Sequence, residues 1–448
     1  MLSFANLFNG LLFKLLTVIF TGFLAIPSLP SGLFKELPKA GDDFTPVIRF
    51  AVCSDVHLNG NPEDISAEHL RNMLKDVYAY SDSQAYDKLD AILVAGDFAT
   101  GNSTENASAI VDSQYELFNQ ITGEGVRAGT EIFCVLGNHE FINFRDYDPH
   151  IAYEKYQKYI CKDVDRHLVI NGYHIIGVSY DDDAYHFTGK KKWLKNELKA
   201  AAADTPDKPI FVFNHPHPFA TVYGSVSWSD FDLRTVLSQF PQVIDFSGHS
   251  HYAANDPRSI WQESFTAVGS GSLCCQMSCL DYLTGGQDAT GESGVFWIVE
   301  GDANGNVRLK LYDVVSHCFF EDADYYLENT SKLTGRRYTW NNLKSLDTAP
   351  EFPQGATVTA SKDENGNLIL SYPDAKGYFP AESYKINVYS GAKSVASGSF
   401  DSNYVRAIRD GVVTNVGKVD AGTYTVTVTP CSPYAKTGNA IKATITVD

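Results

Sequence analysis

The chain has 448 residues, of which 44% are hydrophobic and 20% charged, and its formal net charge at pH 7 is −18. This length fits two or three domains of roughly 100–200 residues each, and the composition is that of a packed globular protein rather than a disordered one. The negative charge argues against a nucleic-acid duplex as partner, because a phosphate backbone requires a basic surface, but a small phosphate ester stays possible, since bound cations reverse the local potential of a site.

The first residues are typical of a targeting segment. The run from Leu11 to Ile26 is almost wholly apolar apart from Lys14, and a stretch rich in Pro and Ser follows it. The run is short for a membrane span, which needs ~20 apolar residues, and fits the apolar core of a secretory signal peptide better. Because it has no clean small-residue cleavage site, a retained anchor is the main alternative. We expect residues 1–32 to be a signal peptide or N-terminal anchor, and the protein to be exported and either secreted or anchored at the cell surface.

A regular alternation of strands and helices begins near residue 47. Three short apolar runs are predicted strands: 47–52, 91–95 and 131–136. Two stretches with apolar residues at helical spacing are predicted helices: 67–80 and 109–121. Each of these strands ends in a short polar motif. Because ligands bind beyond the carboxyl ends of the strands in an α/β sheet, we expect the motifs to share one edge.

The pattern changes in the second half of the chain. After a predicted helix at 191–202, two more strands precede motifs, and from residue 266 on the strands follow one another without helices, which indicates a second, more antiparallel sheet. The later predicted strands of this part are 209–213, 243–247, 266–268, 294–299 and 307–314. Beyond a Pro-containing boundary near 348–355, four β-type runs alternate with turn residues: 357–359, 368–372, 384–389 and 423–429. This is typical of a small all-β sandwich of roughly 100 residues.

Five short motifs with metal-binding residue types each follow an apolar strand. In chain order they are Asp55-Val56-His57, Gly96-Asp97, Gly137-Asn138-His139-Glu140, Asn214-His215 and Gly248-His249-Ser250-His251. Imidazole suits zinc, iron or nickel, whereas carboxylate and carbonyl oxygens suit manganese or magnesium. In an extended loop, the outer residues of an Asp-x-His or His-x-His motif point the same way, so each pair can hold one ion or span two. Each motif alone is more often an ordinary turn, but all five in order indicate a site for two divalent cations.

In these motifs the chain resembles the calcineurin-like metallophosphoesterase superfamily, over roughly residues 47–315. It is similar to exported bacterial members that carry a C-terminal β-sandwich of the immunoglobulin or fibronectin III type. The resemblance implies an α/β fold, a four-layer α/β/β/α sandwich followed by the small all-β sandwich. It also implies two divalent metal ions, Mn, Fe or Zn, at the sheet edges.

The resemblance assigns a role to each motif residue. One metal would be held by Asp55, His57 and His251, the other by Asn138, His215 and His249, with Asp97 bridging the two. His139 would lie beside the substrate, and Glu140 would orient it. The implied domains are a catalytic domain at residues 46–320, a linker at 321–349 and the β-sandwich at 350–448.

The expected reaction is hydrolysis of a phosphodiester by attack of a metal-bridging hydroxide. His139 would stabilise the phosphoryl charge or protonate the leaving group. The alternatives are a phosphomonoesterase of broad specificity, or a surface-binding protein whose phosphoesterase domain is inert; the complete ligand set opposes the latter. The expected partner is a small phosphate ester, with attachment to a membrane or cell surface possible through the N-terminal segment or the C-terminal domain.

Two positions depart from the family pattern. Many relatives carry an Asp or Tyr three residues beyond the bridging Asp, where this chain has Thr100. A second histidine, His217, follows His215 closely; we expect His215 to be the ligand because it directly follows the strand, and His217 to contact the substrate or support a ligand.

The chain has eight cysteines. Cys53 and Cys134 end apolar strands and are predicted to be buried thiols. The pairing of the others, which include the cluster Cys274, Cys275 and Cys279, stays open.

Overall fold

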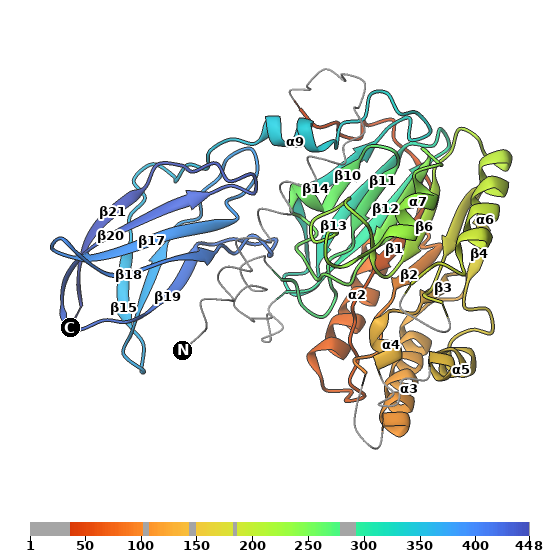
Figure 1. Cartoon of the computed structure of the whole chain (residues 1–448), viewed down its shortest axis with the longest axis horizontal. Coiled ribbons are helices and arrows are strands. Elements are labelled where there is room, and N and C mark those ends of the chain that lie inside the picture. Colours follow the sequence, from red (N-terminus) through yellow and green to blue (C-terminus); the bar gives the residue numbers. More distant parts are fainter. Residues whose placement is uncertain (1–35, 102–106, 143–148, 182–185, 278–292, 448) are drawn as a thin grey trace. The chain divides into compact units, whose positions relative to one another are not determined.

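The computed structural model describes residues 36–101, 107–142, 149–181, 186–277 and 293–447, which form two compact units (Figure 1). The first unit contains the described residues up to Trp340, and the second contains those from Asn341 onward. No helix within these residues is long and apolar enough to span a membrane. The expected signal peptide or anchor at residues 1–32 lies outside them.

Two six-stranded sheets form the frame of the first unit. One sheet has the order β14-β13-β12-β1-β2-β3 and the other β10-β11-β9-β6-β5-β4. The strands of the first sheet are β1 (Pro46–Cys53), β2 (Ala91–Ala95), β3 (Glu131–Val135), β12 (Val295–Asp302), β13 (Val307–Asp313) and β14 (Cys318–Leu327). The strands of the second are β4 (Arg166–Ile170), β5 (Tyr173–Gly177), β6 (Ile210–Asn214), β9 (Val243–Ser247), β10 (Ile260–Gln262) and β11 (Thr266–Gly269).

The strands that precede the motifs run parallel within each sheet. β1, β2 and β3 are parallel neighbours in the first sheet, and β5, β6, β9 and β11 are parallel neighbours in the second. The returning strands pair antiparallel, as β12 does with β1. The carboxyl ends of the parallel strands therefore meet at one edge of each sheet.

Helices and short segments connect and cover the sheets. The helices are α2 (Ile65–Asp82), α3 (Ala107–Gly125), α4 (Asn138–Ile142), α5 (Pro149–Tyr159), α6 (Lys191–Asp204), α7 (Phe231–Leu237), η1 (Pro257–Ser259) and α9 (Trp340–Leu346). Two short strands, β7 (His217–Pro218) and β8 (Ser229–Asp230), pair beside β6 and β9. Helix α2 begins at Asp64, whose carboxylate accepts a hydrogen bond from the backbone N–H of Ser66.

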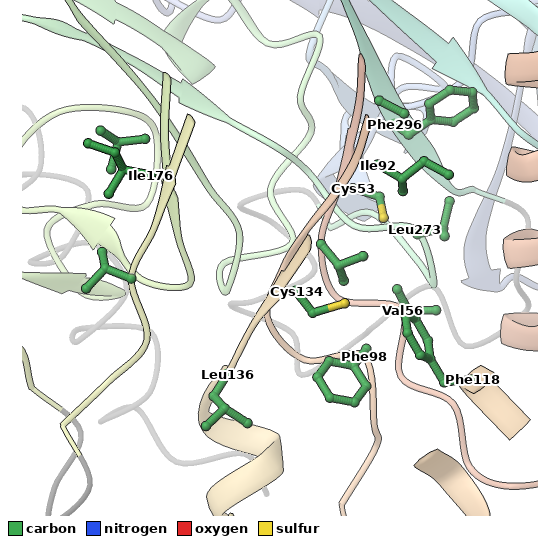
Figure 2. Close-up of a cluster of buried hydrophobic side chains, with 14 of the residues drawn as sticks. Cys53, Val56, Ile92, Phe98, Phe118, Cys134, Leu136, Ile176, Leu273 and Phe296 are labelled. Atoms are coloured by element: carbon green, nitrogen blue, oxygen red, sulfur yellow. The ribbon is translucent and has the colours of Figure 1, made fainter. Parts of the chain in front are cut away.

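The inner strands β2, β5, β6, β9, β11 and β12 are buried along their whole length, because a second layer covers each face of the sheets there. Between the sheets, the rings of Phe50 and Phe211 lie 4.8 Å apart and those of Phe133 and Phe213 lie 4.6 Å apart. On the outer side of the first sheet, Cys53 and Cys134 pack in one apolar cluster with Phe118 of α3 (Figure 2). The fold class is therefore confirmed as a layered α/β sandwich, and the two cysteines are buried thiols as predicted.

The segment expected to be a linker at residues 321–349 differs in the structure. Its first part belongs to β14, which pairs antiparallel with β13 and so extends the first sheet. Alternate residues of this strand, such as Ala323 and Tyr325, are buried. The acidic residues between them made the strand look like a polar connection.

The second unit is built from two β-sheets. A three-stranded sheet has the order β15-β16-β19 and a four-stranded sheet the order β18-β17-β20-β21. Their strands are β15 (Thr359–Lys362), β16 (Asn367–Tyr372), β17 (Ser383–Ser390), β18 (Lys393–Asp401), β19 (Val412–Lys418), β20 (Gly422–Cys431) and β21 (Ile441–Val447). Along β17 the buried side chains alternate with accessible ones, and they join those of both sheets in one apolar core.

A buried ion pair joins β1 to β12 in the first unit. Arg49 stands opposite Glu300 in the strand register, and its Nε donates to Glu300 Oε1 at 2.8 Å. Only 1% of the Arg49 side chain is exposed. The guanidinium also lies over the rings of Tyr80 and Tyr86. Its charge therefore depends on Glu300 rather than on water.

Replacing Glu300 by Met is expected to lower the free energy of unfolding by about 3–5 kcal/mol, because it leaves the Arg49 charge buried without its partner. Denaturant unfolding of the full chain measures the change. Asp82→Asn is the control, since Asp82 and Arg127 form an ion pair in which both side chains are half exposed, and it should leave stability nearly unchanged. Equal effects of the two substitutions would contradict the buried-pair interpretation.

Candidate metal centre

The five motifs lie at the carboxyl ends of β1, β2, β3, β6 and β9, and hydrogen bonds tie their turns together. The backbone N–H of Asp55 donates to the carbonyl of Gly96 at 3.1 Å, and the N–H of His57 donates to that of Asp97 at 3.0 Å. Across the two sheets, the N–H of His249 donates to Asp55 Oδ2 at 3.0 Å. The turns of both sheets thus form one connected surface.

Five candidate ligands have a left-handed backbone conformation, with φ between 53° and 69°. They are Asp55, His57, Asp97, His249 and His251. Such a conformation costs a residue with a side chain on the order of 1–3 kcal/mol and tends to occur at functional sites. The expectation that the Asp-x-His and His-x-His pairs are extended is therefore wrong. Their side chains converge because the backbone turns sharply at each ligand position.

Asp55, His57 and His251 form the first group of converging ligand atoms. His251 Nε2 lies 3.1 Å and His57 Nε2 3.7 Å from Asp55 Oδ1, and the two Nε2 atoms lie 3.0 Å apart. Asp55 Oδ1 is buried and makes no hydrogen bond of regular geometry with the described part of the chain. Two facing imidazole nitrogens and an unsatisfied carboxylate oxygen fit a divalent cation.

Asp97, His215 and His249 form the second group. His215 Nε2 lies 3.0 Å from Asp97 Oδ2, 3.1 Å from His249 Nδ1 and 2.9 Å from Asn138 Oδ1. The other nitrogen of His215 is 2.9 Å from the carbonyl of Ala95, which directs Nε2 toward the group. The donor set of two imidazoles, a carboxylate and a carboxamide oxygen again fits a divalent cation.

Asp97 links the two groups, because it also belongs to a third group with His57 and His139. Its Oδ1 accepts the backbone N–H of His139 at 2.8 Å, while Oδ2 faces the imidazoles of His215 and, at 4.0 Å, His139. The structure therefore brings all seven predicted ligands to one place, with Asp97 between the two groups. Their ligation of metal stays a prediction.

Charges inside the site adjust the ionisation of its members. Burial raises the pKa of the Asp55 carboxyl, but the charge of His251, together with the close contacts of the His251 and His57 rings, outweighs burial and holds this pKa well below its usual range. Burial, followed by the charge of His215, lowers the pKa of His249 to about 3. The carboxylate is therefore ionised and the His249 ring neutral, which are the forms that bind metal.

The expected role of Glu140, to orient His139, stays a prediction, and the structure gives Glu140 a further set of contacts with the backbone. The ring of His139 is oriented by the carbonyl of Thr100, which lies 2.6 Å from Nδ1. The Glu140 carboxylate accepts the backbone N–H groups of Asp97, Ala99 and Gly137 at 3.0, 2.9 and 2.6 Å. Burial, then the nearby Asp97, raises the pKa of Glu140 to about 8, while the N–H donors favour its ionised form. Glu140 thus holds the turn that carries Asp97.

The two positions that depart from the family pattern are both structural. Thr100 donates its hydroxyl hydrogen to the carbonyl of His57 at 2.5 Å, in addition to accepting from His139. His217 is buried with both ring nitrogens bonded to serine hydroxyls, so it does not face a substrate. No disulfide joins two of the described cysteines, and Cys279 lies outside the described residues.

One neighbour of the site carried no motif in the sequence. The half-buried ring of Trp228 meets the ring of His249 edge to face, with centroids 5.0 Å apart and an interplanar angle of 89°. The backbone carbonyl of Trp228 accepts the N–H of His217, so the loop after β6 carries this ring back to the metal groups.

Converging carboxylates and imidazoles at the edge of a layered α/β fold fit a metal-dependent hydrolase. Residues 48–253 match the family model of the calcineurin-like phosphoesterases, and the match contains all seven candidate ligands. The chain thus carries a calcineurin-like phosphoesterase domain and is a metal-dependent phosphoric ester hydrolase. No curated protein matches the chain significantly.

The motif glycines permit close approach of the turns. A Cβ on Gly248 would lie 1.7 Å from Ser54 Oγ and 2.3 Å from Asp55 Oδ2. A Cβ on Gly137 would lie 2.1 Å from Asp97 Oδ1. Any side chain at either position would displace a carboxylate of the metal groups.

Gly248→Ala is expected to weaken metal binding by about 10- to 100-fold, because it moves a turn that supports the ligands. Titration with zinc against a chelating dye measures the affinity. Gly123→Ala is the matched control: Gly123 lies exposed in α3, and a Cβ there would meet nothing within 4 Å. That change should stabilise the protein by about 0.5–1 kcal/mol and leave metal affinity unchanged. Unaltered affinity in Gly248→Ala would refute the packing argument.

Proposed function

We propose that the protein hydrolyses a phosphodiester at a centre for two divalent cations, Mn, Fe or Zn. The observation that carries this proposal is the presence of two facing imidazole pairs, His57 with His251 and His215 with His249, each beside its own aspartate. One cation at each pair would leave Asp97, which belongs to two of the groups, as the bridge.

When bound, cations at these residues would supply an activated water and would neutralise charge on the phosphoryl group. The protein itself supplies His139, which can orient the substrate and exchange a proton with it. The Nδ1 of His139 is engaged by Thr100, so any proton that this residue exchanges with a substrate passes through Nε2. With 34% of its side chain exposed, His139 is placed to contact a bound ester.

The preference for a diester is supported by Trp228. Its ring lies against His249 and gives the site an apolar side wall. Such a wall would suit the second carbon substituent, which a diester has and a monoester lacks, whereas a monoester presents a second ionised oxygen that gains from charged donors.

The cellular setting is also proposed from the sequence. The net charge of −18 supports a small phosphate ester rather than a nucleic-acid duplex as substrate. The apolar run from Leu11 to Ile26 supports export, with attachment to a membrane or cell surface through this segment or through the C-terminal unit.

The test combines metal content with two substrates. The full chain, loaded with manganese, iron or zinc, is expected to bind close to two ions and to hydrolyse bis-p-nitrophenyl phosphate faster than p-nitrophenyl phosphate. Asp97→Asn should lower turnover at least about 100-fold, because it removes the shared carboxylate. Asp82→Asn makes the same chemical change at an exposed ion pair and should have no effect.

Two results would overturn the proposal. Faster turnover of the monoester would establish a phosphomonoesterase of broad specificity instead. Absence of both bound metal and turnover with all three metals would leave a binding protein with an inert phosphoesterase domain.

A further inference from the structure

His217 lies behind the metal groups, in the short strand β7. Only 1% of the residue is exposed. Its Nδ1 lies 2.9 Å from Ser247 Oγ, and its Nε2 lies 2.8 Å from Ser250 Oγ. Both nitrogens are therefore occupied, and the ring can reach neither a cation nor a substrate.

Through the two serines, His217 contacts the segment that carries the candidate ligands His249 and His251. Ser247 is the last residue of β9, directly before Gly248. Ser250 stands between the candidate ligands His249 and His251, and its hydroxyl also accepts the backbone N–H of Tyr252 at 3.3 Å. One imidazole thus holds the loop at two points on either side of His249.

The direction of these two hydrogen bonds follows from the other contact of the Ser247 hydroxyl. The hydroxyl of Ser247 lies near the Asp245 carboxyl and, as a donor toward it, lowers its pKa, so the hydroxyl oxygen can accept from His217 Nδ1–H. The Nε2 of His217 then carries a lone pair and accepts from the hydroxyl of Ser250. A single neutral tautomer satisfies every contact.

This series of contacts extends from Asp245 to the loop that carries His215. The side-chain amide of Asn214, the residue before His215, donates to Asp245 Oδ1 at 2.6 Å. The remaining oxygens of this pair, Asn214 Oδ1 and Asp245 Oδ2, are buried without a hydrogen-bond partner in the described residues. A proton on Asp245 Oδ2 would join them and close a two-bond ring between acid and amide. Burial favours this neutral form, since it raises the pKa of Asp245 well above its usual range.

We propose that His217 is a positioning residue of the metal centre. With Asn214, Asp245, Ser247 and Ser250 it forms the His217 network, which sets the spacing between His215 on one loop and His249 and His251 on the other. The inference rests on the proposed function, because it assumes that these histidines bind a cation.

The test replaces His217 by Gln in the full chain and measures zinc affinity by chelator competition. The variant is expected to bind zinc about 10- to 100-fold more weakly, as typically follows when a partner that orients a metal ligand is lost. The visible absorption spectrum of the cobalt-loaded variant should also change, because the angles between its ligands change. Diester turnover should show a lower kcat with KM nearly unchanged.

His167→Gln is the matched control. His167 also has both ring nitrogens in contacts, with Glu197 at 2.8 Å and His174 at 2.8 Å, but these lie on β4, β5 and α6. This variant should lose thermal stability while its zinc affinity and cobalt spectrum stay those of the unaltered protein. If the unaltered protein binds no metal, the proposed function fails. If it binds metal and His217→Gln behaves like the control, the positioning role alone is refuted.

Substitution of Asp245 tests the proton at the end of the network. Asp245→Asn should keep zinc affinity close to that of the unaltered protein, because a carboxamide replaces a neutral carboxyl and donates to Asn214 Oδ1. Asp245→Leu should weaken zinc binding by about 10- to 100-fold, because Ser247 and Asn214 lose their acceptor. Equal weakening in the two variants would show that Asp245 is ionised and that the assigned proton is wrong.

Discussion

Left-handed backbone at five ligand positions is the constraint around which the active-site turns are built. A residue in this conformation reverses the chain within one step and presents its side chain and its neighbours' N–H groups in new directions. The freed N–H groups find carboxylates: Glu140 accepts three of them, and Asp55 Oδ2 accepts that of His249. Glycines at 137 and 248 leave room for these contacts. Strain at each ligand is thus offset by hydrogen bonds that are themselves parts of the site.

Two aspartates of the site each use one oxygen for a backbone N–H and leave the other oxygen among the imidazoles. Asp97 uses Oδ1 for the N–H of His139 and leaves Oδ2 among the imidazoles, and Asp55 uses Oδ2 for the N–H of His249 and leaves Oδ1 toward His251. Each aspartate therefore has a fixed orientation before a cation arrives. Such preorganisation reduces the rearrangement that metal binding requires.

Much of this arrangement followed from the order of motifs along the chain. Polar motifs behind parallel strands must meet at one sheet edge, and the structure gathers all of them there. The same reasoning failed where the geometry depends on the turn itself. His139 and Glu140, neighbours on a short helix, have different partners, the carbonyl of Thr100 for His139 and the backbone N–H groups of Asp97 and Gly137 for Glu140, which their adjacency did not predict.

Other features lacked a signal in the sequence altogether. Trp228 reaches His249 through the path of a loop, which no local pattern encodes. His217 stands two residues after a candidate ligand, and only its two serine partners, from a strand and a loop some thirty residues away, decide that it supports the site. The strand β14 was hidden by acidic residues on its accessible face. Long-range packing settles each of these cases.

The first and the second candidate metal group each take their ligands from both sheets. The first combines Asp55 and His57 of one sheet with His251 of the other, and the second combines Asp97 with His215 and His249. A bound cation would therefore act as a cross-link between the two sheets at their shared edge. Because a ligand that binds only the folded state stabilises it in proportion to the logarithm of its concentration, the lifetime of this protein against proteases would follow the supply of metal in its surroundings.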